Sequence, residues 1–355
     1  PLIQILLGIG IGLCLPNNQY HLDTELFLAL VIGPLLFREA QEADITSILK
    51  HWRIVLYLIF PVIFISALSM GGLAHVLWAS LPLAACVAVG AALGPTDLVA
   101  FASLSQRFSF PKRVSNILKG EGLLNDASGL VAFRMALIAW TTGTFSLTQA
   151  GTSLAISIVG GFAVGFITAL INRFLHTFLL SVRATDIASE LLLELSLPLL
   201  TFFIAEGIHV SGIIAVVVAG ILKASRFKKI NLLEAQVDTV TETVWQTVTF
   251  MLNGSVFVIL GMELEMIAEP ILKSAFYNKV LLLLSVFLLT FLLFAIRFVM
   301  IYGFYAFRIK KLHKSLDKYV KDMLLLTFSG VKGTVSIATI LLIPSNLEQE
   351  YPLLL

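Results

Sequence analysis

The chain has 355 residues, a net charge of +2 and two cysteines. Apolar residues make up 58% of it and charged residues only 13%, whereas about one quarter of a soluble domain is charged. This composition excludes a water-soluble globule, a strong polyanion-binding protein and a disulfide-rich scaffold. We therefore expect an all-α, polytopic membrane protein embedded in the lipid bilayer, with no nucleic-acid partner.

Runs of about 20 apolar residues predict membrane-spanning helices. Eleven candidate runs follow one another along the chain, near residues 1–16, 24–38, 54–72, 82–105, 113–141, 149–172, 187–206, 210–223, 242–261, 279–306 and 322–343. A further apolar run starts at Pro352, and no initiator methionine precedes the first run. We expect spans to be missing at both ends.

Lys and Arg residues are spread unevenly over the connections between these runs. Eighteen of the 24 lie in the alternate connections 38–53, 107–113, 173–183, 223–229 and 308–321. The opposite connections contain only Lys273 and Lys279. Because cytoplasmic loops carry the positive charge, this alternation supports the eleven-span prediction and places residue 1 at the cytoplasmic face of the plasma (inner) membrane.

The run 118–133 places ionisable groups inside a predicted span, where each charge costs about 2.5–3.5 kcal/mol. Glu121 and Asn125 share a helical face, because residues i and i+4 are neighbours, and Asp126 follows directly. Carboxylate and carboxamide oxygens suit a hard cation, and the same carboxylate can take a proton instead. We predict a cation and proton site at Asp126 with Asn125. For Glu121, an ion pair with a basic residue is the favoured alternative.

The run 82–105 is interrupted by Gly94 and Pro95, and proline removes a backbone donor from a helix. Broken backbone at membrane depth is tolerated where it lines a cavity or is buried in protein. Thr96 and Asp97 follow at once, so a hydroxyl, a carboxylate and freed carbonyls come together. We predict that Thr96 and Asp97 are further cation ligands beside Asp126, with a simple proline kink as the alternative.

A second interruption is predicted in the run 322–343, where Gly330 and Gly333 bracket Lys332. The two interrupted runs cross the membrane in opposite directions, which is typical of inverted-repeat transporters. Lys332 can then offset the partial negative charge of helix C-termini at the crossing. Arg297 lies alone in the middle of 279–306 and needs an acidic partner, for which Glu121 is the candidate.

Four segments together resemble the NhaP/NHE branch of the monovalent cation/proton antiporters. They are Glu121-Gly-Leu-Leu-Asn125-Asp126, the Gly94–Asp97 segment, the helix 245–261 and the segment 329–336. The resemblance implies an inverted-repeat fold of thirteen spans, two of which are interrupted helices that cross each other. About 11–12 of the thirteen spans would be present in this chain. It also implies scaffold and dimerisation spans at 1–38 and 149–261, a core transport bundle at 54–141 and 279–355, and a homodimer.

The resemblance implies roles for individual residues as well. Asp126 would bind the exchanged cation and proton, helped by Asn125, Thr96 and Asp97, while Glu121 and Arg297 form a structural ion pair. The Asn-Asp pairing implies electroneutral exchange. Three residues depart from the family pattern, with Leu98 in place of Pro, Gly122 in place of Ser and Lys332 in place of Arg.

The leading hypothesis is therefore a bacterial secondary antiporter that exchanges Na+ for H+ and serves pH homeostasis. K+ and Li+ remain alternative cations. A sodium-coupled organic-anion symporter and a cation channel remain alternative functions. No nucleophile–base set or cofactor motif predicts an enzyme, and we expect no cofactor besides the transported Na+ or K+ and H+.

Overall fold

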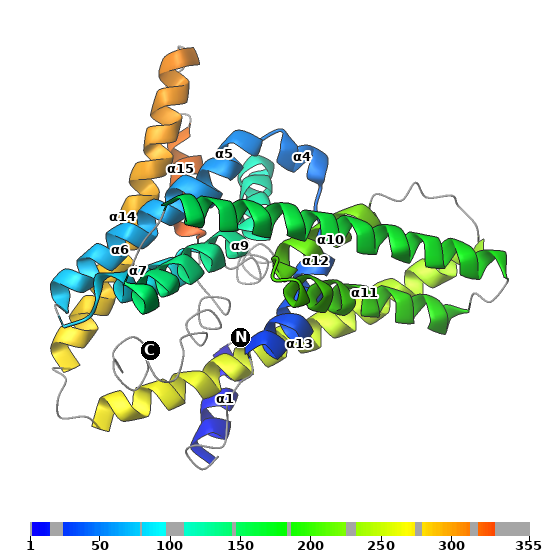
Figure 1. Ribbon diagram of the computed structural model, residues 1–355, viewed down its shortest axis with the longest axis horizontal. Coiled ribbons are helices and arrows are strands. Elements are labelled where there is room, and N and C mark those ends of the chain that lie inside the picture. The colour runs from blue at the N-terminus through cyan, green and yellow to red at the C-terminus, as the bar shows by residue number, and fades with distance from the viewer. Residues whose placement is uncertain are drawn as a thin grey trace. The chain divides into compact units, whose positions relative to one another are not determined.

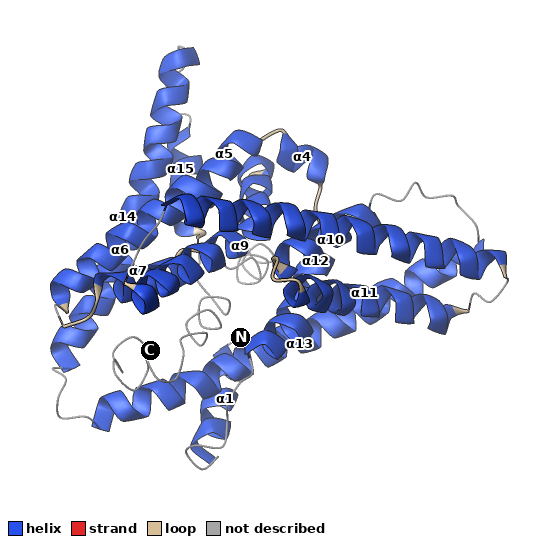
Figure 2. Ribbon diagram, viewed as in Figure 1, coloured by secondary structure: helices blue, strands red, loops and turns tan. Residues whose placement is uncertain are grey.

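The computed structural model describes residues 2–14, 24–78, 80–96, 110–143, 147–182, 186–224, 232–273, 279–312 and 319–330. Every regular element in these ranges is a helix, and they contain no strand (Figure 2). Within them, six helices are long and apolar enough to cross a membrane: Trp52–Leu77, Lys112–Thr142, Gly151–Leu179, Ile187–Gly207, Thr239–Leu264 and Leu283–Arg308. Shorter apolar helices are Leu2–Cys14, Leu83–Ala92 and Gly212–Ala224. The all-α prediction is confirmed, and the total of eleven spans stays a prediction.

The chain forms two compact units. One comprises Pro1–Gly8, Asn18–Ala43 and Leu147–Gly261, and the other comprises Ile9–Asn17, Asp44–Ser146 and Met262–Leu355. The scaffold role expected for 1–38 and 149–261, and the transport role expected for 54–141 and 279–355, stay predictions.

The first unit is built around a buried helix. Its elements are α1 (Leu2–Cys14, first part), α2 (Thr24–Phe27), the π-helical turn η1 (Leu28–Ile32), α3 (Gly33–Glu42), α10 (Leu147–Ser181), α11 (Ile187–Gly207), α12 (Gly212–Ala224) and most of α13 (Leu232–Lys273). Helices α3, α10 and α11 pack around α12, whose apolar side chains are buried. Close contact depends on small residues, since a Cβ on Gly165 would lie 2.2 Å from the carbonyl oxygen of Ala215.

Two charged and two amide side chains join four of these helices at one end of α12. The ammonium of Lys223 lies 2.8 Å from a carboxylate oxygen of Glu194 and donates to the carboxamide oxygen of Asn172 at 2.9 Å. Gln41 donates to the other carboxylate oxygen of Glu194 at 2.7 Å. Because Lys223 and Glu194 are both largely buried, their pairing neutralises two charges that would otherwise be costly in this position.

The second unit surrounds one long helix, α9. Its elements are α4 (Ile45–Leu49), α5 (Trp52–Tyr57), the π-helical turn η2 (Leu58–Val62), α6 (Ile63–Leu77), α7 (Leu83–Ala92), α9 (Lys112–Thr142), α14 (Lys279–Leu312) and α15 (Val320–Phe328). Helix α9 contacts α6, α7, η2 and α15, and α6 lies beside α7 (Figure 1). The side chains of α6, α7 and α9 share an apolar cluster that includes Ala67, Ala88 and Phe133. This packing fixes the position of α9, which contacts both α7 and α15.

Both predicted interruptions begin where a described helix ends. Helix α7 stops at Ala92, and Pro95 and Thr96 continue in a non-helical conformation. Helix α15 stops at Phe328, and Gly330 is already non-helical. The continuations at 97–109 and 331–355 lie outside the described residues, so the crossing of the two segments stays a prediction.

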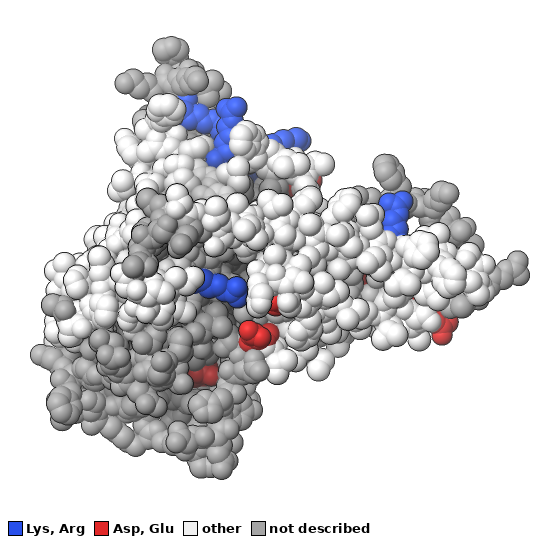
Figure 3. Space-filling view, in the orientation of Figure 1, with Lys and Arg blue, Asp and Glu red and all other residues white. Residues whose placement is uncertain are grey.

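Many large apolar side chains are exposed on the described helices. Figure 3 shows few charged side chains among the described atoms of the visible face. Phe287 and Phe291 on α14 and Phe174 on α10 are each at least 70% exposed. Such large exposed aromatic side chains are costly in water and favourable in hydrocarbon. Together with the long apolar helices, they identify a multi-pass protein embedded in a membrane.

Candidate cation site

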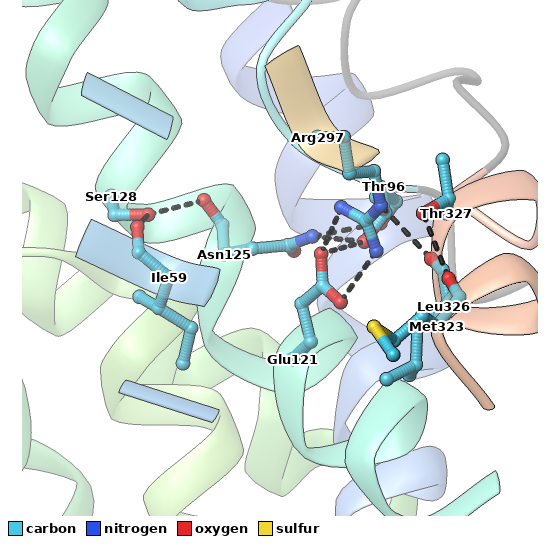
Figure 4. Close-up of polar contacts among 9 residues, drawn as sticks. All are labelled: Ile59, Thr96, Glu121, Asn125, Ser128, Arg297, Met323, Leu326 and Thr327. Carbon is cyan, nitrogen blue, oxygen red and sulfur yellow. Dashed lines mark hydrogen bonds and ion pairs between the residues drawn. The ribbon is translucent and has the colours of Figure 1, made fainter. Parts of the chain in front are cut away.

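A buried ion pair joins α9 to α14. The two terminal nitrogens of Arg297 donate to the two carboxylate oxygens of Glu121 at 2.6 and 2.8 Å (Figure 4). Glu121 is 1% exposed and Arg297 is 4% exposed. A planar guanidinium matches a carboxylate at two points, which fixes the orientation of both side chains. The structure thus brings together the acid and the base that the sequence had paired.

Arg297 also contacts the end of α15. Its Nε donates to the carbonyl oxygen of Leu326 at 3.0 Å. The last carbonyls of a helix have no donor within the helix and carry partial negative charge. A Cβ on Gly330 would lie 2.7 Å from Nε of Arg297, so the glycine leaves room for the guanidinium. Arg297 therefore supplies positive charge at this helix end, and the similar role predicted for Lys332 stays a prediction.

Thr96 and Asn125 extend the ion pair into a chain of polar contacts (Figure 4). The hydroxyl of Thr96 donates to Glu121 Oε1 at 3.3 Å, and the carboxamide nitrogen of Asn125 donates to that hydroxyl. The same nitrogen donates to the backbone carbonyl of Thr96 at 3.1 Å. Buried hydrogen bonds of this kind strengthen one another in a low-dielectric interior.

The orientation of the Asn125 carboxamide follows from its neighbour. The backbone carbonyl of Thr96 only accepts hydrogen bonds, so the amide nitrogen of Asn125 has to face it. The amide oxygen then points elsewhere, and within the described residues no group donates to this buried atom. A buried polar atom without a partner calls for an explanation, such as a bound ion or a water molecule. Asn125 Oδ1 is thus a buried oxygen, on the residue before Asp126, that receives no hydrogen bond from the described residues.

For three predicted site residues the structure describes only the backbone or nothing. Asp126 lies on the described backbone of α9, directly after Asn125, while its side chain lies outside the described part of the chain. Asp97 and Lys332 lie outside the described residues altogether. Of the predicted set, the structure thus brings together Thr96, Glu121, Asn125 and Arg297.

Two residues of α9 close to Asn125 were not predicted from the sequence as part of the site. The hydroxyl of Ser128 lies within hydrogen-bonding distance of the backbone carbonyl oxygens of Ile59, at 3.0 Å, and of Asn125, at 2.8 Å. Gly129 lies against the interruption after α7, since a Cβ there would lie 2.1 Å from Cγ of Pro95. The sequence signal was present but weak: both are small residues placed three and four positions after Asn125 on one helical face.

Comparison with known proteins decides the family. A family model described as "Sodium/hydrogen exchanger, transmembrane" matches residues 1–355. The chain belongs to this family. The NhaP/NHE-type resemblance of its motifs is thereby confirmed, and the exchanger family is one of cation/proton antiporters.

Curated relatives of the exchanger family cover nearly all of the chain. The "Sodium, potassium, lithium and rubidium/H(+) antiporter" of Bacillus pumilus is 34% identical over 354 residues, which are 99% of this chain and 53% of that protein. The "Uncharacterized Na(+)/H(+) exchanger YjcE" of Escherichia coli is 31% identical over 356 residues, covering 97% of this chain and 64% of that protein. The chain thus spans roughly half to two thirds of the length of these relatives.

Solved structures show the same fold. The sodium proton antiporter MjNhaP1 from Methanocaldococcus jannaschii aligns with a TM-score of 0.68 at 18% identity. The alignment covers 99% of this chain and 80% of that one. The prediction of an antiporter-type membrane fold is therefore confirmed.

Proposed function

We propose that the protein is a secondary antiporter that exchanges Na+ for H+ across the plasma membrane by competition of the two ions at Asp126. The observation that carries the proposal is the unpartnered oxygen of Asn125, which is buried next to Asp126 on the helix of the exchanger signature. A hard monovalent cation prefers such oxygen ligands. Thr96 and Asp97 are the further ligands in this proposal.

The Glu121–Arg297 ion pair adds no net charge to the proposed site. Arg297 neutralises Glu121 at 2.6 Å, so this acid does not need a transported ion. Asn125 is neutral. If Asp126 alone titrates and Asp97 keeps its charge throughout, either one monovalent cation or one proton binds in each state of the site. Such a site exchanges ions one for one, and the exchange is electroneutral.

The range of cations is part of the proposal. The Bacillus pumilus relative is named for sodium, potassium, lithium and rubidium. We propose that Na+ is exchanged here as well, with K+ and Li+ as alternative substrates of the same site. We further propose that the protein acts as a homodimer, with residue 1 at the cytoplasmic face.

The test is proton movement in proteoliposomes that contain the full-length protein with an imposed pH gradient. Adding Na+ or K+ to the wild type should dissipate the gradient, and Asp126→Asn should abolish this response, because a carboxamide cannot exchange a proton. Asp186→Asn is the matched control. Asp186 caps α11 by accepting from the backbone of Ser189 at 2.8 Å, and asparagine caps a helix equally well, so exchange should persist.

Other outcomes separate the alternatives. Sodium uptake that depends on an organic anion and moves no protons would indicate a symporter, and currents far above carrier rates would indicate a channel. The family and structural matches support neither of these functions. Cation-coupled proton movement that survives in Asp126→Asn would remove Asp126 from the proposed site.

A further inference from the structure

The membrane-crossing helix Trp52–Leu77 contains one irregular turn. Its middle, Leu58–Val62, is π-helical and includes Pro61. Proline has no backbone N–H and disturbs the hydrogen-bond ladder of the preceding turn. The N–H of Ile63 bonds to the carbonyl of Phe60 instead of following the regular α-helical pattern. Such π-helical turns in long helices are frequent at functional sites.

Ser128 contacts this irregular turn from α9. Its side chain is buried, at 3% exposure, and its hydroxyl lies within hydrogen-bonding distance of the Ile59 carbonyl at 3.0 Å. The Asn125 carbonyl on its own helix is the second acceptor, at 2.8 Å. A serine hydroxyl has one proton, so it donates to one of the two carbonyls at a time. When it donates to the Ile59 carbonyl, the hydroxyl links the turn of α9 that carries Asn125 to the π-helical turn.

The same α9 turn also contacts the interruption after α7. Gly129 lies against the ring of Pro95, and Asn125 donates to the carbonyl of Thr96. The four residues after Asn125 thus lie against two irregular backbone segments, the π-helical turn Leu58–Val62 and the interruption after α7. Asp126 follows Asn125 within this turn, so its backbone position depends on both contacts.

We propose that Ser128 is a positioning residue for ion exchange, whose hydroxyl sets the cation affinity by holding the Asn125–Asp126 turn against the π-helical turn Leu58–Val62. This inference rests on the proposed exchange function. Ser128 acts through the backbone of its neighbours, and its loss should weaken cation binding without stopping turnover.

The experiment measures the KM for Na+ and the maximal exchange rate of the full-length protein in proteoliposomes. Ser128→Ala should raise KM about threefold to tenfold, as expected for one buried hydrogen bond, with a maximal rate near that of the wild type. The pH of half-maximal exchange at fixed Na+ should shift to more alkaline values, because a proton competes better against a weakly bound cation. Ser128→Thr, which keeps the hydroxyl, should restore most of the affinity.

Ser66→Ala is the matched control. Ser66 lies on α6 in the same unit at 4% exposure, and no cross-helix hydrogen bond of its hydroxyl is found among the described residues. Its replacement should leave KM and the pH profile unchanged. If Ser128→Ala yields too little folded protein, Ser128→Cys keeps the side-chain volume with a weaker donor and should still raise KM.

The outcomes distinguish this inference from the function on which it rests. An unchanged KM and pH profile in folded Ser128→Ala, beside an active wild type, would overturn the positioning role and leave exchange at Asp126 intact. An equal rise of KM in Ser66→Ala would also overturn the positioning role, because the loss of any buried hydroxyl in this unit would then raise the KM for Na+. A wild type without cation-coupled proton movement would overturn both.

Discussion

Arg297→Met should destabilise the protein by about 3–5 kcal/mol, because it leaves the buried carboxylate of Glu121 without its cation. Glu121 would lose both guanidinium contacts, and the carbonyl of Leu326 would lose its donor. The measurement is thermal unfolding of the purified protein in detergent, together with the yield of folded protein. Arg308→Met is the matched control, since Arg308 is exposed on the same helix, and it should change stability little.

A double variant tests the reason for this loss. Combining Arg297→Met with Glu121→Gln removes both charges, so the double variant should be more stable than Arg297→Met alone. If the stability changes of the single variants Arg297→Met and Glu121→Gln simply add in the double variant, the carboxylate and the guanidinium are not energetically coupled. Their role as the fixed ion pair of the site would then be contradicted.

Gly129→Ala should cost about 1–3 kcal/mol of stability, the usual effect of overpacking a buried position. The new Cβ would lie 2.1 Å from Cγ and 2.7 Å from Cδ of Pro95, and a proline ring cannot move aside by changing rotamer. The clash should push the Pro95–Thr96 segment away from α9 and weaken the contact between Thr96 and Asn125. Cation affinity should therefore fall together with thermal stability.

Gly72→Ala provides the comparison for this prediction. Gly72 lies on α6, and a Cβ there would meet no atom within 4 Å, so alanine should be neutral or slightly stabilising in the helix. Equal behaviour of the two alanine variants would contradict the proposed tight contact between α9 and Pro95.

Much of the fold could be predicted from the order of apolar runs. The expected spans 113–141 and 187–206 correspond to Lys112–Thr142 and Ile187–Gly207, because a helix in lipid needs a long apolar run that satisfies its own backbone. The partnership of Glu121 and Arg297 could be proposed for a related reason. A charge within a span needs a counter-charge, and only a few acids within spans were available as partners.

The tertiary contacts at the site could not be predicted in the same way. The bond from Arg297 to the Leu326 carbonyl depends on where α15 ends relative to α14, and no periodicity within one helix encodes that register. The bond from Ser128 to Ile59 depends on the irregular turn at Pro61, where the sequence predicted a continuous span from 54 to 72. Lys223 was assigned to a connection, and the structure pairs it with Glu194.

The most direct test of the central claim is the apparent Na+ affinity of the wild-type protein, measured in proteoliposomes over a series of pH values. If Na+ and H+ compete for one carboxylate, the affinity should rise about tenfold per pH unit on the acidic side and level off once Asp126 is fully ionised. An apparent affinity that stays constant across the whole titration range would contradict competition at a single site.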